Sequence, residues 1–224
     1  MDKLVLFDID GTLLMPSRAH KEAFRYALKR IYGVEVDVEG IAVPGATDRQ
    51  IIVEALKARG LNDKIIKARL TRCEEAVVEA YARMSTREEV IKGAKELLES
   101  LNSHGFLIGL ATGNIEGVAK IKMGRVRLGR YFRVGGFGND HYDRGELVKT
   151  AVKRAKNVFG FEGLVVVIGD TPRDVNAAKK AGVKVLGVAT GKYSIEELRR
   201  SGADYVAGDL KEALTLLLND PLND

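Results

Sequence analysis

Acidic side chains follow two hydrophobic runs of the sequence, at the points where each run ends. Asp8 and Asp10 follow the run LVLF, and Asp170 and Asp174 follow the run VVVIG. Side chains two positions apart lie on the same face of a strand, so the first pair can point into one site. Carboxylates near an apolar wall are costly unless a cation offsets their charge. Carboxylate oxygens suit Mg²⁺, which takes other ligands from water and phosphate, so the four acids predict a Mg²⁺ site.

Groups suited to a phosphate ligand follow a third hydrophobic run. FLIGLA ends in Thr112, Gly113 and Asn114, which supply a hydroxyl and backbone N–H groups freed by a glycine turn. The later stretch HYDRGELVK supplies a cation, either Arg144 or Lys149. A hydroxyl, free amides and a cation together predict binding of a phosphoryl group.

Short apolar runs separated by longer amphipathic stretches must position these residues. The runs predicted as buried strands are residues 4–7, 106–111, 134–137, 165–169, 183–189 and 204–207. In most of the stretches between them, apolar residues recur at spacings of three and four, which predicts helices. Unbroken apolar strands that alternate with helices predict an α/β fold with a parallel sheet covered on both faces.

One long region breaks this alternation. From about residue 17 to about residue 85 the sequence contains three amphipathic helix patterns and no convincing buried strand. Helices inserted after the first strand of an open α/β sheet would lie above the carboxyl ends of the strands, where such sheets bind ligands. We therefore predict a helical cap domain over residues 16–85 and a core formed by residues 1–15 and 86–224.

Three motifs carry a resemblance to a known family. DIDGTL at residues 8–13, ATGN at residues 111–114 and IGDTPRD at residues 168–174 resemble, in this order, three motifs of the haloacid dehalogenase superfamily. The resemblance covers nearly the whole chain, cap included, and points to phosphoglycolate-phosphatase-like members. It implies a doubly wound, Rossmann-like core, a Mg²⁺ cofactor and an aspartyl-phosphate intermediate.

The resemblance also implies a role for each motif residue. Asp8 would be the nucleophile, and Asp10 would act as general acid and then as general base. Thr112 would hold a phosphate oxygen. Asp170 would bind Mg²⁺ together with Asp8 and the backbone carbonyl of Asp10. Asp174 would support the ligands of the metal.

The sequence departs from the family at the third motif, which is normally a lysine. By its distance to the following helix, Arg144 fills that place and keeps the charge, but on a flat, forked group. Lys149 is the alternative, although it would lie inside that helix. In the predicted cap, Thr47 and Arg49 lie where a turn enters a helix, and this stretch resembles the substrate-specificity loop of helical-capped phosphatases. Arg49 would then contact an anionic part of the substrate. In the alternative, Thr47 or Asp48 caps the helix and Arg49 lies in solvent.

The second acid of the first motif narrows the set of reactions that the resemblance allows. Dehalogenases of this superfamily lack that acid, because a halide leaves without a proton, and phosphonate-cleaving members replace it. Asp10 therefore favours hydrolysis of a small phosphomonoester, such as phosphoglycolate or another small phosphorylated acid or sugar. Two alternatives stay open: a sugar-phosphate mutase similar to β-phosphoglucomutase, and a protein that binds a phosphate ligand without catalysis.

Composition limits the partners and the compartment. The chain has 224 residues, a formal net charge of +5 and a single cysteine, which favours a reducing, cytoplasmic location. The basic stretch 120–133 lacks acids, and we interpret it as a solvated face rather than a nucleic-acid surface. No apolar run is long enough to span a membrane. We expect a monomer or homodimer, and His20, His104 and His141 as surface residues.

Overall fold

The computed structural model describes residues 3–36, 45–84 and 87–219. Within them, six strands form one sheet in the order β3-β2-β1-β4-β5-β6, with every neighbouring pair parallel. The strands are β1 (Lys3–Phe7), β2 (Leu107–Ala111), β3 (Val134–Gly136), β4 (Leu164–Gly169), β5 (Lys184–Val188) and β6 (Tyr205–Ala207). Each strand lies on one of the six predicted runs, to within one residue at its ends. This order is that of a doubly wound, Rossmann-like sheet, so the predicted fold class is confirmed.

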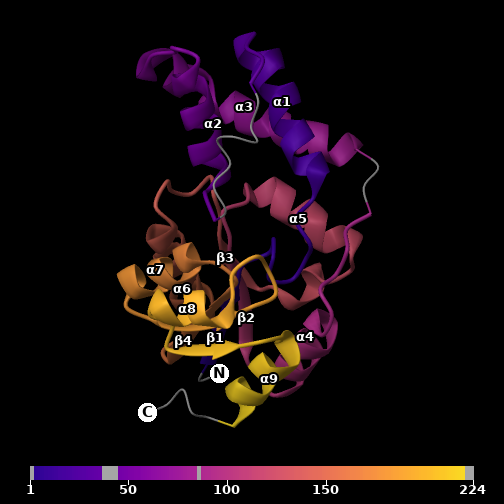
Figure 1. Cartoon of the computed structure of the whole chain (residues 1–224), viewed down its shortest axis with the longest axis vertical. Helices are drawn as coiled ribbons and strands as arrows, with labels where there is room; N and C mark the ends of the chain where they lie inside the picture. Colours follow the sequence, from indigo (N-terminus) through magenta and orange to yellow (C-terminus); the bar gives the residue numbers. More distant parts are fainter. Residues whose placement is uncertain (1–2, 37–44, 85–86, 220–224) are drawn as a thin grey trace.

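The helices alternate with these strands, except between β1 and β2 (Figure 1). The α-helices of the described residues are α1 (Arg18–Tyr32), α2 (Asp48–Ala58), α3 (Asp63–Arg83), α4 (Ala94–Ser103), α5 (Glu116–Arg125), α6 (Arg144–Phe159), α7 (Pro172–Ala181), α8 (Ile195–Arg200) and α9 (Leu210–Leu218). A 3-10 turn, η1 (Gly129–Tyr131), precedes β3. None of the helices described combines the length and apolar character that a bilayer span requires.

Different helices cover the two faces of the sheet, and the alternation of side chains along the strands explains how. On β1, Val5 and Phe7 belong to a hydrophobic cluster shared with α4, α5 and α9. Leu4 and Leu6 belong to a second cluster, shared with α6, α7 and α8. Successive side chains of a strand point to opposite faces, so a strand covered on both faces has an unbroken apolar sequence.

Helices α1, α2 and α3, which we call the cap helices, lie together at one end of the molecule (Figure 1). They share a third hydrophobic cluster, to which Val118 of α5 and Ile115, the residue before that helix, also belong. The side chains of Ser17, Thr47 and Asn62 each accept a hydrogen bond from a first-turn N–H of the helix that follows. The boundary predicted at residues 85–86 lies outside the described residues, so the division into two domains stays a prediction.

Candidate active site

The chain leaves β1 through Asp8 and Asp10, which both line one cavity. Ile9, between them, is completely buried in the core, as the alternation of side chains requires. At Gly11 the backbone turns with a φ of +89°, and a Cβ there would lie 2.3 Å from a carboxylate oxygen of Asp170. Glycine is therefore needed here both for the backbone conformation and for the close approach of Asp170.

Asp8, Asp170 and Asp174 form a buried cluster of carboxylates. One oxygen of each lies within 4.8 Å of the others. Asp170 follows β4 and accepts a hydrogen bond from the Thr12 hydroxyl at 3.1 Å. Asp174 lies in the first turn of α7, where it forms a capping box with Thr171. Two neighbouring strands and one helix start thus bring the three acids together.

Burial of these acids raises the pKa of two of them. Burial raises the pKa of Asp8 to about 6, with Arg144 opposing the shift and the charges of Asp174 and Asp10 adding to it. Burial, together with the charges of Asp174 and Asp8, raises the pKa of Asp170 to about 8. The protein therefore supplies less positive charge than the ionised acids require. This set of oxygen donors fits a divalent cation such as Mg²⁺.

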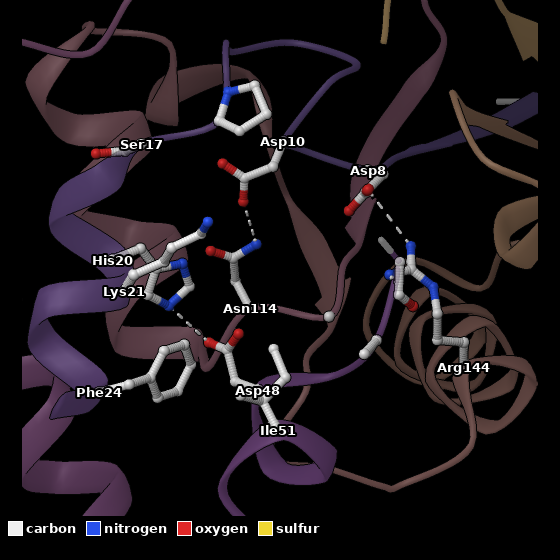
Figure 2. A pocket seen from close by; sticks show the side chains of 14 residues that line it. Asp8, Asp10, Ser17, His20, Lys21, Phe24, Asp48, Ile51, Asn114 and Arg144 are labelled. Atoms are coloured by element: carbon white, nitrogen blue, oxygen red, sulfur yellow. Dashed lines mark hydrogen bonds and ion pairs between the residues drawn. The ribbon is translucent and has the colours of Figure 1, made fainter. Parts of the chain in front are cut away.

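The guanidinium group of Arg144 lies beside the acids, at the first residue of α6 (Figure 2). It forms an ion pair with Asp174, lies 3.5 Å from an Asp8 carboxylate oxygen, and donates a hydrogen bond to the Gly45 carbonyl at 3.1 Å. Burial would lower the pKa of Arg144, but the charges of Asp174 and Asp8 raise it above its ordinary value. The group stays charged and is held from three directions.

Lys149, the other candidate for this cation, lies one turn further along α6. Its ammonium group forms an ion pair with Glu146 at 2.7 Å, and both side chains are more than two-fifths exposed. A lysine in that position cannot reach the acids, because its side chain leaves the helix on the solvent side. The structure therefore places Arg144 in the site and leaves Lys149 outside it.

The predicted phosphate loop follows β2. Gly113 and Asn114 line the cavity, and the side-chain amide of Asn114 donates to Asp10 at 2.8 Å. Thr112 is completely buried, and its hydroxyl oxygen accepts from the backbone N–H of Asn114 at 3.3 Å and from its side-chain amide at 3.0 Å. Thr112 supports Asn114 here and does not itself line the cavity.

Thr47 and Arg49 lie at the start of α2, and neither lines the cavity. Thr47 is completely buried and forms a capping box with Gln50, which agrees with the helix-cap alternative. Arg49 donates two hydrogen bonds to Glu74 on α3, at 2.6 and 3.0 Å, instead of lying in solvent. Thr47 therefore caps α2, and Arg49 joins α2 to α3 without lining the cavity.

Three further polar residues, which no sequence motif marks, form a network that begins at Asp10. The Lys122 ammonium lies 2.8 and 2.6 Å from the two carboxylate oxygens of Asp10 and 3.3 Å from Nδ1 of His20. The Nε2 atom of His20 lies 3.1 Å from an Asp48 oxygen (Figure 2). Burial would raise the pKa of Asp10, but the charges of Lys122 and His20, with hydrogen bonds from Lys122 and Asn114, lower it.

Two sequence predictions are wrong at this network. His20 is only 9% exposed, because it lies on the inner face of α1 with Ala23 and Phe24. The stretch 120–133 is not a solvated face throughout, because Lys122 on α5 is 1% exposed. The apolar spacing around His20 could have indicated its burial, whereas nothing in the sequence distinguishes Lys122 from its basic neighbours. The other two histidines are exposed, as predicted.

These groups enclose a cavity of about 170 Å³ between the sheet and the cap helices (Figure 2). Asp8 and Arg144 lie at one side of it, and Ser17 and Phe24 of the α1 region and Ile51 of α2 line the other. Pockets for drug-sized ligands span about 300–1,000 Å³, so this cavity suits a smaller molecule. One end of the cavity is therefore strongly polar, and the other end has both polar and apolar side chains.

Several known proteins are similar in sequence to this chain over most of its length. The phosphoglycolate phosphatase of Pseudomonas fluorescens is 29% identical over 199 residues, covering 85% of this chain and 71% of that protein. The tyrosine-protein kinase PtkA of Mycobacterium tuberculosis is 26% identical over 226 residues, covering 95% of this chain and 72% of that protein. Both likenesses extend over the cap helices as well as the sheet.

Solved structures agree in fold. A hydrolase from Pseudomonas syringae superposes with a TM-score of 0.71 at 24% identity, covering 98% of this chain and 99% of that one. A protein named provisionally as a β-phosphoglucomutase, from Thermotoga maritima, superposes with a TM-score of 0.61 at 25% identity, covering 98% of this chain and all of that one. The profile of the haloacid dehalogenase-like hydrolases matches residues 5–188, from β1 to β5. Because that match spans most of the chain, the protein belongs to the haloacid dehalogenase-like hydrolase family.

Proposed function

We propose that this protein is a Mg²⁺-dependent phosphatase that hydrolyses a small phosphomonoester through an aspartyl-phosphate on Asp8. The observation that carries the proposal is the position of the Asp8 carboxylate. It lines the cavity, with Arg144 at 3.5 Å on one side and the Asp170–Asp174 pair behind it. Phosphoryl transfer needs little push from its nucleophile and much neutralisation of charge, which Arg144 would supply in part and a Mg²⁺ ion held by the acids would complete.

Each step has a group in place. An oxygen of Asp8 attacks phosphorus and the ester bond breaks. Asp10, which must carry a proton once the ester is bound although Lys122 lowers its pKa in the free protein, gives that proton to the leaving oxygen. Asp10 then takes a proton from a water molecule that attacks the aspartyl-phosphate, which releases inorganic phosphate and restores Asp8. Arg144 and the N–H groups at Gly113 and Asn114 would hold the phosphate oxygens.

The residues that would hold Mg²⁺ are Asp8, Asp170 and the backbone carbonyl of Asp10. Bound there, the ion supplies neutralisation of the charge on the phosphoryl oxygens. Asp174 would act indirectly, because its oxygens already bind Arg144 and the N–H and hydroxyl of Thr171. This division matches the roles that the sequence motifs imply.

The cavity and the family relationship support a small substrate. A volume of about 170 Å³ favours a phosphate group on a leaving group of a few atoms, such as phosphoglycolate. The phosphoglycolate phosphatase of Pseudomonas fluorescens is among the relatives. The protein named as a β-phosphoglucomutase keeps a mutase as the second candidate, with a hexose phosphate that would require the cap to open further. We further propose that residues 16–85 act as the cap that encloses the substrate.

The deciding experiment measures phosphate release from p-nitrophenyl phosphate, phosphoglycolate and simple sugar phosphates, with Mg²⁺ and with EDTA. We expect release that needs Mg²⁺, is lost in Asp8→Asn and is kept in Asp63→Asn, a control that changes an exposed acid at the start of α3. Absence of release from every ester by folded protein with Mg²⁺ would refute the phosphatase. Interconversion of glucose 1-phosphate and glucose 6-phosphate without net release would establish the mutase instead.

A further inference from the structure

Lys122 is almost completely buried, beside a site that already contains three acids and an arginine. Its side chain is 1% exposed and does not line the cavity, so it cannot touch a ligand there. Burial of an ammonium group is costly unless the group is paired and fully hydrogen-bonded. The partners of Lys122 therefore indicate what this residue does.

The ammonium group has three hydrogens, and the structure gives each of them an acceptor. The acceptors are the two carboxylate oxygens of Asp10, at 2.6 and 2.8 Å, and the side-chain oxygen of Asn114, at 2.8 Å, while Nδ1 of His20 lies 3.3 Å from the ammonium nitrogen. The amide nitrogen of Asn114 donates to the same Asp10 carboxylate at 2.8 Å. The orientation of Asp10 is thus fixed from two sides, by α5 and by the loop after β2.

The pair of Asp10 and Lys122 is asymmetric. The Asp10 side chain is 25% exposed and lines the cavity, whereas that of Lys122 is sealed behind it. Enclosing both partners would strengthen the pair but would add the cost of desolvating the carboxylate. This pair instead leaves one side of the carboxyl group open to a substrate and fixes the remainder.

We propose that Lys122 is a positioning residue, which holds the Asp10 carboxyl group in the orientation that reaches the leaving-group oxygen. The proposal rests on the proposed function, in which Asp10 transfers a proton to that oxygen. The network continues from Lys122 through His20 to Asp48, which also accepts the backbone N–H of Ile115 at 2.7 Å. Positioning of Asp10 therefore depends on α1 and α2 being seated against α5.

This role predicts a dependence on the leaving group. A nitrophenolate ion leaves without a proton, so its transfer to Asp8 does not need a well-placed Asp10. An alkoxide is a poor leaving group and needs the proton. Loss of Lys122 should therefore slow phosphoryl transfer from an alkyl ester far more than transfer from p-nitrophenyl phosphate, whereas general damage to the fold would slow both alike.

The test compares Lys122→Met with the wild type in single-turnover experiments with Mg²⁺. One substrate is p-nitrophenyl phosphate, whose reaction is measured by the burst of nitrophenol. The other is an alkyl ester, phosphoglycolate or glycerol phosphate, whichever the wild type cleaves faster. Positioned proton transfer is worth about 10²–10⁴-fold, so we expect a loss of about tenfold or more with the alkyl ester and less than about threefold in the burst. The control is Lys120→Met, which removes an exposed lysine of the same helix and should change neither rate.

A second pair of variants isolates the action through Asp10. If Lys122 acts only by positioning that residue, Asp10→Asn and the double variant Asp10→Asn, Lys122→Met have equal burst rates. This comparison remains informative if Lys122→Met alone fails to fold, because the double variant leaves no carboxylate facing the missing charge. Equal losses with both esters, or a further tenfold loss in the double variant, would overturn the proposal. Absence of turnover by the wild type would instead count against the proposed function.

Discussion

Magnesium should stabilise this protein much more at pH 8 than at pH 5. The pKa of Asp8 is raised from 3.8 to about 6 in the folded protein, and that of Asp170 to about 8. At a pH between the ordinary and the raised pKa, each of these acids keeps a proton in the folded chain that it has lost in the unfolded chain. The contribution of each acid to the stability of the folded protein is therefore fully present below about pH 4, and it is lost as pH rises through the folded pKa of that acid.

The two pKa shifts give the size of the effect. Between pH 5 and pH 8, Asp8 lowers the free energy of unfolding over about one pH unit, up to its folded pKa, and Asp170 lowers it over about three. Each pH unit is worth about 1.4 kcal/mol. The sum, about 5 kcal/mol, is an upper bound because the two acids titrate together. For a chain of this size, about 2–5 kcal/mol corresponds to a fall of roughly 5–15 °C in Tm. Metal binding requires the ionised acids, so Mg²⁺ should reverse this fall at pH 8 and have little effect at pH 5.

The assay is thermal unfolding at pH 5 and pH 8, with Mg²⁺ and with EDTA. Other groups also titrate over this range, so the decisive quantity is the Mg²⁺-induced rise in Tm at each pH. Asp170→Asn serves as the matched variant: it lacks the acid with the largest shift, so its Tm in EDTA should fall less between pH 5 and pH 8. An equal Mg²⁺-induced rise at both pH values, or none at pH 8, would refute the reasoning.

Three further predictions concern the site and the cap helices. Arg144→Lys keeps the charge but loses the fork that reaches two acids and a carbonyl, so kcat/KM should fall about tenfold or more, whereas Lys149→Met should stay within about twofold in the same steady-state assay. Gly11→Ala places a Cβ 2.3 Å from a carboxylate at positive φ, so calorimetry should detect loss of Mg²⁺ binding. Arg49→Ala breaks a partly buried pair with Glu74, so Tm should fall while KM for the best small ester stays within about twofold.

The sheet could be predicted because its strands carry a local signal. Each of the six runs is short, apolar on both faces and followed by a helix pattern, as parallel packing requires. The acids at the ends of β1 and β4 could be placed together for the same reason, since parallel strands end at one edge of the sheet. Arg144 followed from its place at a helix start. These features depend on the order of residues over short distances.

The network around Asp10 could not be predicted in this way. Lys122 lies among basic residues of similar type, and only the packing of α5 beneath the cap helices shows that it is enclosed. Asp48 lies in the first turn of α2, where an acid is ordinary, and its bonds to His20 and the Ile115 N–H depend on how α1 and α5 meet. Burial of a charged side chain is set by tertiary contacts, which residue type and spacing do not encode.

The central pairing of β1 with β4 has a consequence for how the protein is made. Thr12 and Asp170 are hydrogen-bonded although 158 positions separate them, and the strands that precede them are neighbours in the sheet. Closing so long a loop is slow, and the gain comes only after the loop has closed. During synthesis the acids that follow β1 emerge first. They have no partners until β4 and the start of α7 have left the ribosome. We therefore expect a nascent chain that stops before residue 170 to contain Asp8, the proposed nucleophile, and to have no activity.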